Sequence, residues 1–165
     1  PNGEIPPQYT CFGENISPAL EWSGVPAEAQ SLLLLVHDLD AGAALGASTE
    51  AGFSHWVVYN LPPSLAGLPE NVPAGGQLEN GALQGRNDFA RFASEGETFP
   101  GGALIKRIGY DGPCPPEGRH RYAFTLYVLD SLLDLPPAAT TEQVLAAMSD
   151  HVLDQAEIIG EYASP

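Results

Sequence analysis

Proline and glycine interrupt this chain along its whole length, and that limits the kind of fold it can form. There are 16 prolines and 18 glycines, scattered without a repeat period. Both residue types end regular secondary structure, so we expect short elements joined by turns rather than long helices. A chain of 165 residues is long enough for one domain with a full hydrophobic core, and we take residues 1–165 as a single domain.

Four segments have the composition of β-strands. Continuous apolar runs are typical of strands buried on both faces, and aromatic and β-branched residues favour strands in general. The predicted strands are residues 31–37 (SLLLLVH), 55–60 (HWVVYN), 121–129 (RYAFTLYVL) and 157–162 (EIIGEY). Because they do not alternate regularly with helices, the pattern favours a mainly-β sandwich with a peripheral helix over a parallel α/β sheet.

One helix is well signalled near the C-terminus. Thr140 followed by Gln143 is a capping-box pattern, in which each side chain bonds the other residue's backbone N–H. Apolar residues then recur at helical spacing within an alanine-rich segment. They are Val144, Leu145, Met148 and Val152. The spacing predicts a helix from about residue 141 to about residue 153.

The chain is strongly acidic, and this excludes some partners. Its formal charge is −15, from 21 acidic residues against 6 lysines and arginines, and Lys106 is the only lysine. Nucleic-acid affinity comes mainly from Lys and Arg neutralising phosphates, so we predict no nucleic-acid partner. No apolar run approaches the roughly 20 residues of a membrane-spanning helix, so we predict no integral membrane segment. An anionic ligand must therefore be captured by local donors against the global field.

The two cysteines, Cys11 and Cys114, fit no metal-binding spacing. They either form a disulfide, as expected of an exported protein, or stay as buried thiols in a reducing cytosol. No basic segment followed by an apolar one opens the sequence, so no signal peptide is visible. Localisation stays open, with the cytoplasm slightly favoured unless the two cysteines are bridged.

Three clusters contain residues suited to binding a ligand or to catalysis. The first is HDLD (37–40), where Asp38 and Asp40 follow a predicted buried strand. The second is SHW (54–56), with His55 at a strand start, and the third is GPCPPEGRHRY (112–122), a stiff loop that runs into the longest strand. A carboxylate fixes the tautomer of a neighbouring histidine, and histidine, tyrosine and a glycine N–H are donors that bind an anion without Lys or Arg.

Each cluster also has a purely structural interpretation. Aspartates after a strand often cap a turn, and a single histidine at a strand start is usually a satisfied partly buried residue. Zinc binding by Asp38, His55 and His120 is conceivable, but no HxH or CxxC spacing supports it. We therefore predict no metal and no cofactor.

Taken together, the motifs resemble the phosphatidylethanolamine-binding protein family, in particular its bacterial branch of Raf-kinase-inhibitor-like proteins. The resemblance covers nearly the whole chain in order. It rests on YTCFGENISPALEWSGVP (9–26), HDLDAG (37–42), SHWVVYNLP (54–62), GRNDF (85–89) and GYDGPCPPEGRHRYAFTLYVLD (109–130), of which the last is the most specific.

The resemblance implies a Greek-key β-sandwich with a small ligand pocket at one end. Family members hold the phosphate or phosphoryl head of a ligand there, or acetate and similar anions. Carried over by motif, the expected ligand-binding residues are Asp38, Asp40, His55, Gly112, His120 and Tyr122. Asp38 is expected to orient one histidine, and His120 and Tyr122, two apart on one strand, to face the same side.

The chain departs from the family pattern in three places. Leu39 and Gly42 replace the two prolines of the family's Asp-Pro-Asp-Ala-Pro motif, so this loop is expected to be less rigid. Residues 90–108 form an insertion, which is either a tolerated surface loop or a lid whose Phe92, Phe99, Leu104 and Ile105 cover a ligand. The chain also starts short of an N-terminal strand that is usual in the family.

Three classes of function fit these observations. The favoured one is a binding or regulatory protein whose partner is a small anion such as phosphate, a phosphoryl headgroup or a carboxylate. The second is an enzyme using the same pocket for acid–base chemistry, although no GxSxG motif is present and nothing in the sequence activates Cys114. The third is an interaction module that inhibits a kinase or a protease.

Overall fold

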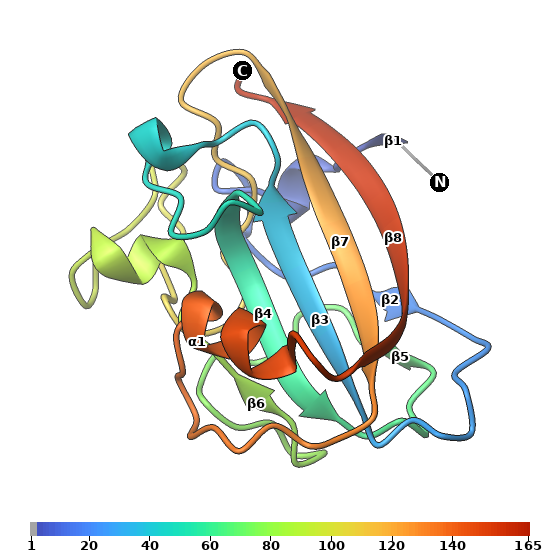
Figure 1. Ribbon diagram of the computed structural model, residues 1–165. Helices are drawn as coiled ribbons and strands as arrows, with labels where there is room; N and C mark the ends of the chain where they lie inside the picture. The colour runs from blue at the N-terminus through green and yellow to red at the C-terminus, as the bar shows by residue number, and fades with distance from the viewer. Residues whose placement is uncertain (1–2) are drawn as a thin grey trace.

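The computed structural model describes residues 3–165, and within them the fold is mainly β with one α-helix near the C-terminus, as predicted (Figure 1). The strands are β1 (Gly3–Glu4), β2 (Leu20–Glu21), β3 (Ser31–Asp38), β4 (Phe53–Leu61), β5 (Gly67–Leu68), β6 (Leu83–Gln84), β7 (Arg119–Leu129) and β8 (Val152–Ala163). The helix is α1 (Thr141–Met148), and three 3-10 turns are η1 (Pro7–Tyr9), η2 (Ala43–Leu45) and η3 (Asp88–Arg91).

Six strands form one large sheet in the order β1-β8-β7-β3-β4-β6, and β2 pairs with β5 in a separate two-stranded sheet. All pairings are antiparallel except β1 with β8. β3 lies at the centre, between β7 and β4, and all eight of its residues are buried. This explains its continuous apolar sequence, because a central strand covered on both faces exposes no side chain.

The large sheet is packed on both faces. Leu32, Leu34 and Val36 of β3 belong to the core on one side, which also contains Trp56 and Phe124. On the other side, residues of β3 and β4 pack against Val144 and Met148 of α1, which lies in front of the sheet in Figure 1. The alternation along β3 thus divides one apolar run between two cores.

The helix is shorter than predicted. Its capping box is present, with Thr140 Oγ1 accepting from the Gln143 N–H and Gln143 Oε1 accepting from the Thr140 N–H. However, the helix ends at Met148, and Val152 begins β8. Val152 matches the helical spacing by sequence alone, but its backbone pairs with Leu129 of β7. The pairing of β7 with β8 therefore overrides the helical spacing of the apolar residues at this point, as tertiary contacts often do.

The last strand is correspondingly longer than predicted. β8 starts at Val152 rather than residue 157, and its first seven residues are exposed. An exposed strand shows neither an apolar run nor a clear alternation, so its sequence signal was weak. At the free edge of β8, Gly3 and Glu4 form the short parallel strand β1.

Cys11 and Cys114 form a disulfide, which decides between the two alternatives left open by the sequence. The bridge joins the loop after η1 to the loop before β7. Phe99 and Ile105 of the insertion are buried with Cys11 in a small apolar cluster, to which Phe89 also packs. The disulfide and residues 90–108 are therefore packed together in an apolar cluster of their own.

We predict that removing this disulfide destabilises the fold markedly. The bridge closes a loop of 103 residues, and long closed loops restrict the unfolded chain most. The double variant Cys11→Ser/Cys114→Ser is expected to lose about 2–4 kcal/mol of unfolding free energy in urea titrations. Added reductant should lower the stability of the parent and leave the double variant unchanged. Coinciding unfolding curves for parent and variant would contradict the prediction.

Candidate functional site

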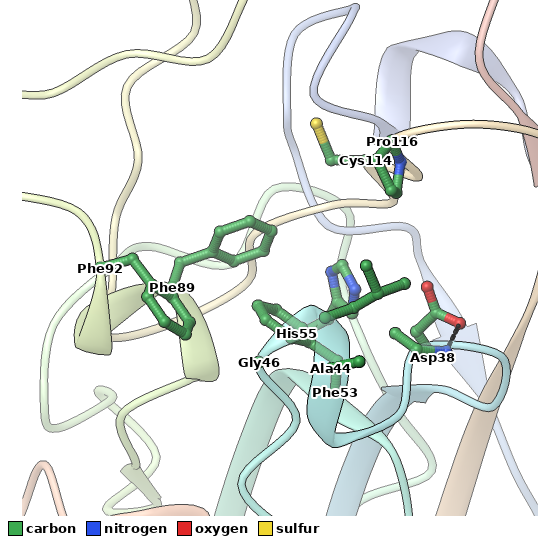
Figure 2. A pocket seen from close by; sticks show the side chains of 11 residues that line it. Asp38, Ala44, Gly46, Phe53, His55, Phe89, Phe92, Cys114 and Pro116 are labelled. Carbon is green, nitrogen blue, oxygen red and sulfur yellow. Dashed lines mark hydrogen bonds between the residues drawn. The ribbon is translucent and has the colours of Figure 1, made fainter.

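A cavity of about 580 Å³ opens at the end of the sheet where β3 ends and β7 begins. Its walls come from the loop after β3, the start of β4, the η3 region and the loop before β7. The lining residues are Asp38, Ala41, Ala44, Leu45, Gly46, Phe53, His55, Phe89, Phe92, Cys114 and Pro116. Figure 2 shows Phe89 and Phe92 on one side, Asp38 on the other and His55 between them. Asp38 and His55 thus form a polar patch in a mostly apolar cavity.

A β-bulge in β4 places His55. Val36 of β3 pairs with Trp56, but the next residue, His37, pairs with Ser54, so His55 is the extra residue. Ser54 on one side of the bulge bonds Thr141 of α1, whereas Trp56 on the other belongs to the opposite core. Bulges re-aim side chains in this way and are common beside functional sites. Here the bulge brings His55 to the cavity.

His55 and Asp111 exchange two hydrogen bonds. The Asp111 backbone N–H donates to the His55 carbonyl at 3.0 Å, and His55 Nδ1 donates to the Asp111 carbonyl at 2.7 Å. Since a carbonyl only accepts, Nδ1 must carry the proton, and the neutral ring presents a lone pair at Nε2. Burial lowers the pKa of His55, which keeps the ring neutral at physiological pH.

The Asp111 carboxylate organises the segments around this pair. It is fully buried and accepts four N–H bonds of 2.8–2.9 Å. The donors are the side-chain amides of Asn15 and Asn87 and the backbone N–H groups of Lys106 and Arg107. One carboxylate thereby joins the N-terminal loop, the GRNDF motif and the end of the insertion. Sequence reasoning missed Asp111, although it lies inside the quoted GYDGPCPP motif.

Asp38 orients His120, as the resemblance implied that it orients one histidine. His120 Nδ1 lies 2.7 Å from Asp38 Oδ2, and both side chains are buried. The other carboxylate oxygen, Oδ1, accepts the backbone N–H groups of Asp40 and Ala41. The loop is therefore held by hydrogen bonds although Leu39 and Gly42 replace its two expected prolines.

Tyr122 lies behind the cavity wall, beside Asp38 and His55. It pairs with Asp38 across the β3–β7 ladder, and its ring contacts that of His55 edge-on, with centroids 5.2 Å apart. Its hydroxyl is buried near the Asp38 carboxylate. Burial and the nearby Asp38 carboxylate raise its pKa, so the hydroxyl stays a proton donor.

The other predicted site residues lie differently. The Gly112 N–H already donates to Asn15 Oδ1 at 2.7 Å, and a side chain at this position would meet the Tyr9 carbonyl. Gly112 therefore serves the close approach of two loops. Asp40 turns outward to Arg121, which binds both of its oxygens and lowers its pKa. His120, Tyr122, Gly112 and Asp40 are not among the side chains that line the cavity.

Residues 90–108, the segment predicted to be an insertion, contribute differently from a simple lid. Phe99 and Ile105 are buried next to the disulfide, and Leu104 is 54% exposed, so none of the three lines the cavity. Phe92 does line it and is 62% exposed. Of the four residues predicted to cover a ligand, two are therefore buried by the disulfide, one is exposed to solvent and one forms part of the cavity wall. Within residues 3–165, no group of three or more His, Cys, Asp or Glu side chains is placed to hold a metal ion.

Comparison with known proteins agrees with these motifs. The family model described as "Phosphatidylethanolamine-binding protein" matches residues 1–163. A UPF0098 protein of Methanothermobacter thermautotrophicus is 49% identical over 97% of this chain and 91% of its own length. The crystal structure of a putative phosphatidylethanolamine-binding protein homologue from Chlamydia trachomatis is 38% identical, with a TM-score of 0.76 over 99% of this chain and 92% of its own. Escherichia coli YbcL is 28% identical, with a TM-score of 0.77 and the same coverage.

We predict that the protein loses stability as the pH falls below about 6.5, the pKa of an unperturbed histidine. Burial lowers the pKa of both His37 and His55, so the unfolded chain binds more protons than the folded one in this range. Each histidine contributes a slope of up to about 1.4 kcal/mol per pH unit. Urea titrations between pH 5.5 and 7.5 should show a smaller slope for His37→Gln than for the parent. Equal slopes for the two proteins would contradict the prediction.

We also predict that Asp111→Asn is strongly destabilising. The amide nitrogen would face N–H donors in place of an acceptor oxygen, and buried donors without partners are costly. The expected loss is on the order of 3 kcal/mol, with faster hydrogen exchange at the Lys106 and Arg107 amides. Asp150→Asn, at an exposed position, is the matched control. Unchanged exchange at these two amides would show that the carboxylate does not hold the end of the insertion.

Proposed function

Because the chain belongs to the phosphatidylethanolamine-binding protein family, we propose that it reversibly binds a small ligand with an oxyanion group in the cavity beside Asp38 and His55. The observation that carries this proposal is the arrangement of that cavity. His55, whose Nδ1 bonds the Asp111 carbonyl, and Asp38, whose carboxylate bonds His120, both line a space of about 580 Å³, within the usual size range of small-molecule sites.

The chemistry of this polar end supports a phosphate, a phosphoryl headgroup or a carboxylate as the bound group. Each histidine has its Nδ1 hydrogen-bonded to the protein, and no partner for its Nε2 lies within the described residues. Tyr122 adds a buried hydroxyl near the Asp38 carboxylate. The apolar wall, with Phe53, Phe89 and Leu45, suits a non-polar substituent on the same ligand. The proposed role is therefore reversible binding of this ligand, through which the protein would act as a regulator.

An enzyme is the second candidate, favoured by one observation. The buried Asp38–His120 pair, at 2.7 Å, is an arrangement that moves protons in many enzymes. The interaction module that inhibits a kinase or protease is supported by the exposed Phe92 and Leu104 on the insertion. Reversible binding without turnover distinguishes the favoured function from the enzymatic one.

The disulfide bears on where this binding takes place. Disulfides persist in oxidising surroundings and are rare in a reducing cytosol. The Cys11–Cys114 bridge therefore supports an exported protein rather than the cytoplasm, which the sequence slightly favoured. Among the described residues, no helix is long and apolar enough to cross a membrane.

We predict that phosphate, phosphoethanolamine or acetate shifts the ring NMR signals of His55 and His120. The His55 ring lines the cavity, and the His120 ring bonds Asp38, which also lines it, so a bound anion changes the surroundings of both rings. His151 lies beyond the opposite end of β7, where it bonds Asp130, and is the internal control. Its signals should not move.

The variant His120→Ala provides the second control. It removes the partner of Asp38, so the anion-dependent shift of His55 is expected to vanish or weaken severalfold. A parent protein in which no anion shifts either ring would contradict the proposed function and move the enzyme and interaction hypotheses ahead.

A further inference from the structure

The cavity has an unusual charge balance for an anion site. Asp38 is the acidic side chain among its lining residues, and its polar ring, His55, has a pKa lowered by burial and is neutral. Among the described residues, no Lys or Arg side chain lines it. The whole chain carries a formal charge of −15. An anion that enters this cavity therefore meets a carboxylate and a neutral ring, and no Lys or Arg among the lining residues.

Two cations of the chain have partners away from the cavity lining, and a third lies at its rim. Lys106 donates to the carbonyls of Asn15 and Tyr110, and Arg121 binds Asp40. Arg91 is at the rim, where its guanidinium donates to the Gly46 carbonyl at 3.1 Å and lies 5.7 Å from the Phe92 ring centre. It is exposed to solvent, so its field is screened, and it is not a lining residue.

The hydrogen bonds of His55 determine where a proton can be added. Nδ1 already donates its proton to the Asp111 carbonyl. The neutral ring therefore offers a lone pair at Nε2, and two lone pairs, one from nitrogen and one from an anion oxygen, repel each other. A proton on Nε2 converts this repulsion into a charge-assisted hydrogen bond.

We propose that oxyanion binding in this cavity is coupled to the uptake of one proton, held on Nε2 of His55 as an N–H that donates to the ligand. This inference rests on the proposed function and adds the charge state of the site: neutral His55 without ligand and imidazolium with it. The ligand class follows, since an anionic oxygen is required and a neutral amide or alcohol would not retain the proton.

The groups around His55 have opposing effects on this proton. The ionisable groups that face it are His37 and Asp38 of β3, Asp88 of η3, Tyr122 of β7, and Asp111 in the loop before β7. Burial, the largest effect, lowers the pKa of His55, and the three carboxylates raise it. A bound anion acts in the same direction as those carboxylates and at closer range. Proton uptake is therefore small without ligand and approaches one proton with it.

Titrations with acetate and with sulfate test the coupling, because both anions are fully ionised between pH 6 and 8. Affinity is measured by NMR, and heats of binding are compared in buffers of different ionisation enthalpy to count protons. We expect about one proton taken up per anion, an affinity about tenfold weaker for each unit of rising pH, and a ¹⁵N shift of His55 Nε2 to its protonated value.

Two variants complete the test. His55→Gln cannot take up the proton, so its residual affinity should be independent of pH. Arg91→Gln removes the guanidinium that bonds Gly46 at the rim and should keep the uptake of one proton. Anion binding without proton uptake, or with Nε2 still unprotonated, overturns this inference and leaves the proposed function standing. No binding of either anion overturns both. The ¹⁵N measurement on the parent decides the matter even if His55→Gln fails to fold.

Discussion

The site depends on one reciprocal contact, in which His55 and Asp111 exchange a backbone and a side-chain hydrogen bond. The same contact fixes the tautomer of the histidine, and the buried carboxylate of Asp111 holds the ends of three loops. A buried carboxylate is tolerated here because four N–H donors compensate for its lost hydration. Asp111, which does not line the cavity, thereby links the positions of these three loops to the tautomer of His55.

Much of the fold could be predicted because it follows from local patterns. The eight buried residues of β3 and the capping box of α1 have strong signals. The end of α1 and the start of β8 could not be predicted, because Val152 fits both structures locally and only its pairing with Leu129 decides. The disulfide likewise depends on two loops that approach each other in space, which composition cannot reveal.

For the site, the motifs pointed to residues that lie near one another in the structure, but not to their individual contacts. Asp38, His55, His120 and Tyr122 do gather at one end of the sheet. The bulge that turns His55 into the cavity has no signature in HWVVYN, since it arises from the register of β3 against β4. Asp40 and Gly112 were predicted beside them, but an ion pair with Arg121 and a bond to Asn15 engage these two residues instead. Phe92, a wall residue, was predicted as part of a lid.

The central claim is that the polar end beside Asp38 and His55 is where the ligand's anionic group binds. A crystal structure of the protein grown with a high concentration of phosphoethanolamine tests it most directly. The account predicts the phosphoryl group within hydrogen-bonding distance of His55 Nε2, with its organic part along the Phe53 and Phe89 wall. A phosphoryl group bound elsewhere, with this cavity holding only water, would contradict it.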